Sequence, residues 1–228
     1  YPGLITIDSQ ETFERQVRER VFPTLMDRLR EPPKAPPPEE EEPKLRDIVY
    51  KGNFDDVQEY FHSRLWSDGL PVVPPTIDRI ERFLKFTDRQ PDEVLGVLLP
   101  ELRQATVWNV AVNGVMAGCR PEYMPILLAV VEAISDPEFG IQHAGSTPGW
   151  EPLIVLSGPL ARDLRFNVMA GAMRVGSQPN TSIGRFLRLY MRNVPGLRSF
   201  PGQTDKGTIG LSFNVVLAEN DEAVTGMG

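Results

Sequence analysis

The chain contains a single cysteine, and the residues around it could give that thiol a chemical role. Cys119 is followed by Arg120 and by Pro121, a residue favoured at the first position of a helix. A thiol in a tight turn before a helix N-terminus, beside a cationic side chain, is expected to have a lowered pKa. Such a thiol serves as a nucleophile, a metal ligand or a proton-transfer group. The alternative is a buried small apolar residue, the commoner environment of a free cysteine.

A second candidate segment contains Trp66, Ser67 and Asp68 and ends in a proline-rich stretch, residues 70–75. Prolines force this stretch into an extended conformation. A rigid connection of this kind could hold Trp66 and Asp68 at the rim of a pocket. On physical grounds alone, a well-specified structural turn is the favoured interpretation.

A third candidate segment, residues 178–185, places Asn180 and Thr181 at an expected helix start and Arg185 in the first turns. Polar caps and a nearby arginine predict a site for an anion or a carboxylate. Arg185, Arg188 and Arg192 also share one helical face, so a solvated basic stripe or an interface row of ion pairs is an equal alternative. Asn113, on the helix expected before Cys119, could face the same turn.

Composition limits the class of protein. The chain has 228 residues, of which 41% are hydrophobic and 24% charged, and its net charge is −7. These values are typical of a globular protein and argue against a general nucleic-acid binder, which needs a basic face. No run of about 18 apolar residues predicts a membrane span. One cysteine and the lack of a signal sequence predict a cytoplasmic protein.

The sequence gives little sign of a cofactor. The two histidines, His62 and His143, are far apart, and no pair of ligands has the spacing of a zinc site. His143 stands in a glycine-rich stretch, where it is an acid–base residue or an ordinary loop residue. No nucleotide-binding motif is present. The cofactor is therefore unknown, and a metal shared with a partner chain is compatible with the sequence.

Hydrophobic periodicity predicts an α/β or α+β fold in which helices pack on a mixed sheet. Residues 1–46 are expected to form a docking helix and a linker rich in proline and glutamate, and residues 47–228 an α/β domain that is incomplete at its C-terminus. The expected helices are residues 11–30, 55–66, 77–84, 106–117, 121–134 and 182–193, and the expected strands are residues 93–99, 153–157 and 208–217.

The N-terminal helix has an apolar stripe with Phe13, Val17, Leu25 and Leu29 at helical spacing, and Pro23 is expected to kink or divide it. The spacer at residues 31–44 is charged and proline-rich and cannot build a core. A helix behind a stiff spacer must dock elsewhere to bury its stripe. Docking on a partner chain is favoured slightly over docking on the main body.

Four motifs resemble one bacterial family, whose members are associated with proteins that carry a motif of selenocysteine or cysteine, glycine, serine and cysteine. The motifs are LWSDGLPVVPPT, VAVNGVMAGCRPEYMPILLAVVEAI, LIVLSGP and NTSIGRFLRLYMRNV. The resemblance covers roughly residues 60–220 and implies a heteromeric enzyme that uses thiol or selenol chemistry on a small organic substrate. The family continues past the strand near Val216, which implies that this chain is cleaved or completed by another polypeptide.

Under this resemblance the candidate residues gain roles. Cys119, Glu122 and Asp68 are expected to be catalytic, with Cys119 as nucleophile or ligand and the carboxylates as proton-transfer groups. The expected substrate-binding residues are Trp66, Asn113, Arg120, Tyr123, Asn180, Thr181 and Arg185. The reaction is expected to be that of a lyase, a hydratase, a hydrolase or a thiol oxidoreductase. The alternatives are a structural subunit that clamps a catalytic partner and a small-molecule binding module.

Overall fold

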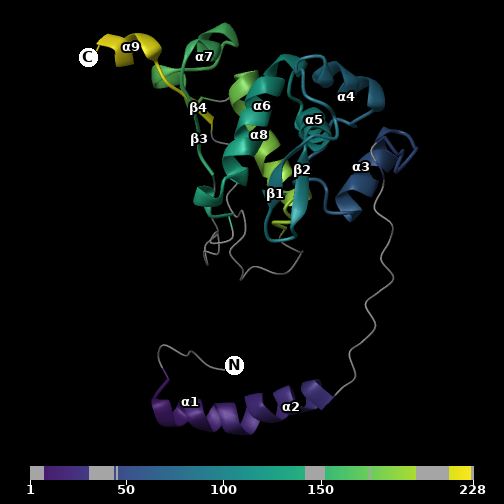
Figure 1. Cartoon of the computed structure of the whole chain (residues 1–228), viewed down its shortest axis with the longest axis vertical. Helices are drawn as coiled ribbons and strands as arrows, with labels where there is room; N and C mark the ends of the chain where they lie inside the picture. Colours follow the sequence, from purple (N-terminus) through teal and green to yellow (C-terminus); the bar gives the residue numbers. More distant parts are fainter. Residues whose placement is uncertain are drawn as a thin grey trace. The chain divides into compact units, whose positions relative to one another are not determined.

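The computed structural model describes residues 8–30, 44, 46–141, 152–174, 176–198 and 216–226. The chain divides into two units, Tyr1–Pro43 and Lys44–Gly228, and each is described by itself (Figure 1). Residues 31–43 of the predicted spacer and His143 lie outside the described residues.

The first unit contains the predicted N-terminal helix, which runs as α1 (Gln10–Gln16), a π-helical turn (Val17–Val21) and α2 (Phe22–Arg30). Ser9 caps its start by accepting a hydrogen bond from a backbone amide of the first turn. The wide turn lies directly before Pro23, which has no amide hydrogen to donate to the preceding turn. Proline therefore alters the helix locally without ending it. None of the residues in these three segments is buried.

The body is built on three helices, α5, α6 and α8, which contact one another (Figure 1). Their shared core includes Val110, Leu127, Phe186 and Tyr190, each without exposed surface. The other helices surround this centre. The helices of the body are α3 (Phe54–Ser63), α4 (Ile77–Leu84), α5 (Val107–Met116), α6 (Met124–Ser135), α7 (Pro159–Asp163), α8 (Gln178–Asn193) and α9 (Asp221–Gly226), with 3-10 turns at Pro121–Tyr123, Pro137–Phe139 and Met169–Gly171.

The strands of the described residues lie in two small sheets, and the predicted α/β content is confirmed. β1 (Val94–Leu98) pairs with β2 (Arg103–Thr106) in an antiparallel ladder. β3 (Ile154–Leu156) pairs with β4 (Val216–Ala218) in a parallel ladder. β1 packs on α6, and β4 lies against α8.

The turn that carries Cys119 is fixed by the end of α5. The amide of Cys119 donates to the carbonyl of Gly114, and the amide of Gly118 donates to that of Val115. This pair of hydrogen bonds is a Schellman motif, which needs a left-handed residue after the helix. Gly118 meets that need with a φ of 78°. Cys119 therefore belongs to the C-terminal cap of α5.

Three predicted helix boundaries are wrong. α6 begins at Met124, not at Pro121, because residues 121–123 form a 3-10 turn. α3 ends at Ser63, not at Trp66, because Leu65 turns into the left-handed region. α8 begins at Gln178 with Ser177 as its N-cap, four residues before the predicted start. The second helical position tolerates a proline, so Pro179 does not delay the helix. Of the predicted strand at residues 208–217, only its last two residues fall within the described β4.

None of the described helices is both long enough and apolar enough to cross a bilayer.

Candidate functional site

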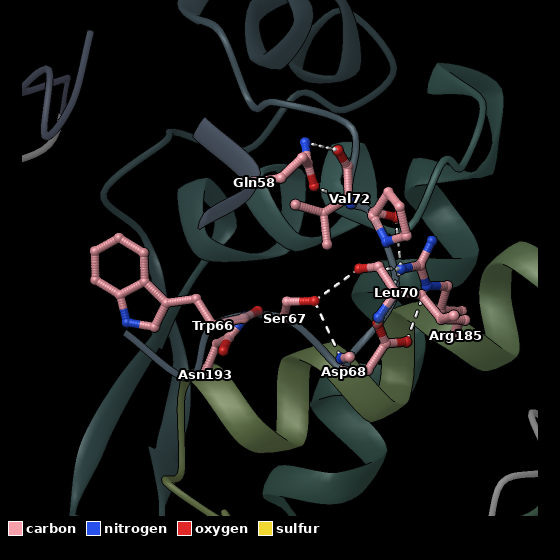
Figure 2. Close-up of polar contacts among 10 residues, drawn as sticks. Gln58, Trp66, Ser67, Asp68, Leu70, Val72, Arg185 and Asn193 are labelled. Atoms are coloured by element: carbon pink, nitrogen blue, oxygen red, sulfur yellow. Dashed lines mark hydrogen bonds and ion pairs between the residues drawn. The ribbon is translucent and has the colours of Figure 1, made fainter. Parts of the chain in front are cut away.

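The three candidate segments converge on α8, and an ion pair is the centre of their contacts. Arg185 donates from Nε and Nη2 to the two carboxylate oxygens of Asp68, each at 2.9 Å (Figure 2). Nη2 also donates to the carbonyl of Pro71 at 2.9 Å. The predicted carboxylate anchor thus holds a carboxylate of its own chain, 117 positions away in sequence.

The two charges are largely withdrawn from water, with side-chain exposures of 16% for Arg185 and 8% for Asp68. Burial alone would raise the pKa of Asp68, but the hydrogen bonds and charge of Arg185 outweigh it and hold that pKa below its usual value. A carboxylate that is ionised and doubly bonded to arginine is a poor general base. The predicted proton-transfer role of Asp68 therefore has no support in this geometry.

The C-terminal half of α8 holds the same loop by its backbone. Arg192 donates to the carbonyl of Leu65 at 3.2 Å, and Asn193 donates to that of Trp66 at 3.2 Å. Asn193 also donates to Oδ1 of the buried Asn113 at 2.9 Å. Arg185 and Arg192 of the predicted arginine stripe therefore form neither a solvated face nor an anion site. Both side chains bind residues of the loop at 65–71 and hold it against α8.

Further contacts fix the loop from within and from α3 (Figure 2). Ser67 donates to the carbonyl of Leu70 at 2.7 Å and accepts from the amide of Gly69 at 3.1 Å. The side-chain amide of Gln58 donates to the carbonyl of Val72 and accepts from its N–H, at 3.0 and 2.8 Å. Gln58 thus imitates a strand partner for the proline-rich stretch. Nothing in the local sequence indicates this contact.

Trp66 faces an aromatic cluster. Its ring packs edge-on against Tyr60 and Phe61 of α3, with centroid separations of 5.8 and 5.6 Å. This environment explains the residue as packing between α3 and the loop. The structural interpretation of the segment at residues 66–75 thus has more support than a pocket rim.

Cys119 is buried, and the pKa of its thiol is raised, whereas the sequence predicts a lowered pKa. Burial raises the pKa of the thiol to about 12, and the neighbouring Ser182 hydroxyl and the charge of Arg185 offset only part of this effect. The amide of Cys119 is bound in the cap of α5, where the helix dipole presents its negative end. The first α-helical residue after it is Met124, beyond a 3-10 turn. An activated thiolate is therefore not expected in this state of the chain.

Ser182 is buried beside the thiol. Its hydroxyl interacts with Cys119 and has no other hydrogen-bond partner among the described residues. Gln178, one turn earlier on α8, donates to the carbonyl of Gly118 at 3.3 Å. The start of α8 is thus joined to the Cys119 turn.

Of the other predicted residues near Cys119, Arg120 and Glu122 reach the surface and Tyr123 is buried. Arg120 and Glu122 form an ion pair of 3.5 Å at the surface. Tyr123 is buried, and burial raises its pKa, with the charges of Arg120, Glu122 and Cys119 as smaller influences. Glu122 is therefore the one predicted catalytic group within reach of solvent.

Asn180 is used inside the fold. Its Oδ1 accepts from the amide of Asn167 at 2.9 Å and from the hydroxyl of Ser177 at 2.6 Å, and its Nδ2 donates to the carbonyl of Val216 at 3.0 Å. These bonds attach β4 to α8 and engage both polar atoms of the buried side chain. The neighbouring Thr181 is exposed.

A pocket of about 250 Å³ lies between α3 and the loop. Its acidic rim includes Asp55 and Glu59, and Leu70 and Pro71 form its apolar side. Across the described part of the chain, no three His, Cys, Asp or Glu side chains lie close enough to hold a metal. None of the predicted catalytic or substrate-binding residues lines this pocket, although Gln58, Ser67, Leu70 and Pro71 belong both to its lining and to the contacts of the loop.

Fold and contacts together define an α/β protein whose polar candidates form a latch: α8 fastens the loop at residues 65–71, the Cys119 turn and β4. No known protein family, curated protein or solved structure matches the chain.

Proposed function

We propose that this chain is a structural subunit of a heteromeric enzyme, to which it contributes binding surfaces and not reacting groups. The observation that carries the proposal is the uncovered apolar stripe of the N-terminal helix. Phe22, Leu25 and Leu29 are 56%, 51% and 71% exposed.

Such a stripe suits the groove of a partner protein. Residues 22, 25 and 29 recur at the spacing of anchors on an amphipathic helix laid in an apolar groove. A helix of this length gains most of its stability from packing. Nothing else within the segment offsets the cost of leaving its apolar stripe in water. Docking would cover the stripe and stabilise the helix together.

The charges of the helix favour a protein over a membrane surface. Residues 8–30 contain five arginines and five acidic residues, so the segment is neutral overall. Helices that lie on membranes are rich in basic residues on their polar face. The occupant that we propose is therefore a partner subunit with an apolar groove and a mixed-charge rim.

The body supports a structural role because its polar candidates are already paired. Asp68 and Arg185 bind each other, Asn180 binds β4, and Asn113 binds Asn193. We also infer a cytoplasmic location, supported by the single cysteine, which is a free thiol.

Native mass spectrometry of the natively purified complex, repeated under denaturing conditions, tests the proposal. We expect a second polypeptide in the wild-type particle and its loss in Leu25→Glu, which puts a charge in the stripe. Arg20→Gln changes the net charge by the same amount on an exposed polar position and should retain the partner. A lone chain in the wild-type sample would contradict the proposal.

A second candidate function is favoured by Ser182. Its buried hydroxyl has no hydrogen-bond partner among the described residues besides its interaction with Cys119, which is compatible with a site that a partner chain or a small organic substrate completes. Under this alternative the subunit supplies thiol chemistry of the kind the family resemblance implies. Loss of turnover in Cys119→Ser, with an unchanged assembly, would favour it over the structural role.

A further inference from the structure

β3 and β4 form a parallel sheet of only two strands, which is an unusual arrangement. Parallel strands occur almost only in sheets that are covered on both faces. A sheet of two strands is also marginal by itself and gains stability when further strands or helices cover it. β3 and β4 are parallel, and each contributes only three residues.

Among the described residues, one edge of this sheet is open to another strand and the other is occupied. The carbonyl of Leu156 accepts from the amide of Glu219, so the backbone groups of Leu156 face β4. Because these groups alternate along a strand, the N–H and C=O of Val155 point away from β4. On the opposite edge, the carbonyl of Val216 is bound by Asn180 of α8. In Figure 1, accordingly, β4 lies between β3 and α8.

Among the described residues, the open edge is protected by its shortness and by Pro152 before it, but by no charged side chain of its own. Leu153 and Val155 are 55% and 54% exposed, and their side chains share one face of the strand. Residues 152–161 contain no charged side chain. Edge strands of monomeric proteins are commonly guarded by charges, bulges or a covering helix.

We propose that the β3 edge pairs with β3 of a second copy of this chain. An antiparallel pairing about a twofold axis sets Val155 opposite Val155 of the second copy and Leu153 opposite Ser157 of the second copy. The outward N–H and C=O of Val155 then bond reciprocally, and the two sheets merge into one of four strands. No like charges meet at the axis, and the strand offers no charge that would select a different protein.

The test is the mass of the full chain in solution as a function of its concentration, measured by sedimentation equilibrium. The wild type is expected to dimerise. Val155→Glu and Val155→Lys each place like charges across the axis and are expected to raise the dimer dissociation constant about tenfold or more. Val155→Thr, which keeps a β-branched side chain without charge, is the matched control and should remain dimeric.

Mixing the two charged variants gives the decisive result. An equimolar mixture of Val155→Glu and Val155→Lys is expected to regain the dimer, because opposite charges then meet at the axis. Far-UV circular dichroism checks that each variant is folded, and Leu153→Glu is a second variant for the same edge. A wild type that is monomeric at every concentration, or charged variants that dimerise as the wild type does, would overturn the proposal.

Discussion

At the scale of single residues, the pair of Asp68 and Arg185 should matter more for stability than the surface pair of Arg46 and Glu81. The surface pair joins side chains that are 57% and 46% exposed, and exposed pairs contribute less than about 1 kcal/mol. Removing one member of a buried pair leaves an uncompensated charge and costs about 3 kcal/mol or more. We therefore expect Asp68→Asn to lower the free energy of unfolding by about 3 kcal/mol in urea titrations, and Glu81→Gln to have little effect. If both variants lost the same free energy of unfolding, the ion pair of Asp68 and Arg185 would not stabilise the fold as we infer.

The same pair predicts how stability depends on pH. The pKa of Asp68 in the folded chain lies below its ordinary value of 3.8. Its contribution is therefore present above pH 3.8 and is lost as the pH falls through the lower folded pKa. Asp68→Asn should lack this part of the acid-induced loss, while the remaining carboxylates titrate as in the wild type.

Cys119 should react slowly in the native chain. Raising its pKa from 9.0 to about 12 leaves about a thousandfold less thiolate at neutral pH. We expect labelling by iodoacetamide to be slow in buffer and fast in urea, with Cys119→Ala as the unlabelled control. Because the folded pKa is the higher one, the stabilisation from the neutral thiol should be lost above about pH 9. Fast native labelling with a midpoint near neutral pH would support the second candidate function instead.

At the scale of the secondary-structure elements, Gly114 tests how closely α5 packs on its neighbours. A Cβ atom at this position would lie 2.7 Å from Cδ1 of Leu127 and 2.9 Å from Cε1 of Phe83. Both side chains are buried and have little room to move. Alanine gains about 1 kcal/mol in helix propensity, but overpacking costs about 1–3 kcal/mol.

We therefore expect Gly114→Ala to destabilise the chain by about 1 kcal/mol in thermal or urea unfolding. Gly171→Ala is the control, since the added Cβ would meet only Asn167 at 4.0 Å. A stabilised Gly114→Ala variant would mean that α4, α5 and α6 pack more loosely than these distances indicate.

Helix ends could be predicted from the sequence where the capping residues interact only with their neighbours in the chain. The predicted helix at residues 106–117 differs from α5 by one residue at each end, with Thr106 as its N-cap and Gly118 in its C-terminal cap, because capping depends only on neighbours. The start of α8 was missed because Asn180 is typical of a cap, although here its side chain binds β4. Propensity cannot show that a capping residue has a tertiary partner.

At the scale of the whole molecule, the sequence could indicate which segments carry polar candidates but not how their charges pair. Asp68 and Arg185 are 117 positions apart, and Gln58 reaches Val72 over 14. A partner at such a distance has no periodic signature. A carboxylate predicted to be catalytic thus proved to be bonded to an arginine predicted to bind substrate. The environment of the thiol followed from burial, which spacing does not reveal.

The two proposed surfaces belong to different units of the chain, so they should fail independently. The helix stripe lies within residues 8–30 and the β3 edge within residues 153–157. We expect the native particle to contain two copies of this chain together with its partner. In native mass spectrometry, Leu25→Glu should lose the partner and keep two copies, whereas Val155→Glu should keep the partner and halve the copy number. If either change removed both the partner and the second copy, one surface would be serving both contacts, and the separation of docking helix from dimer edge would be wrong.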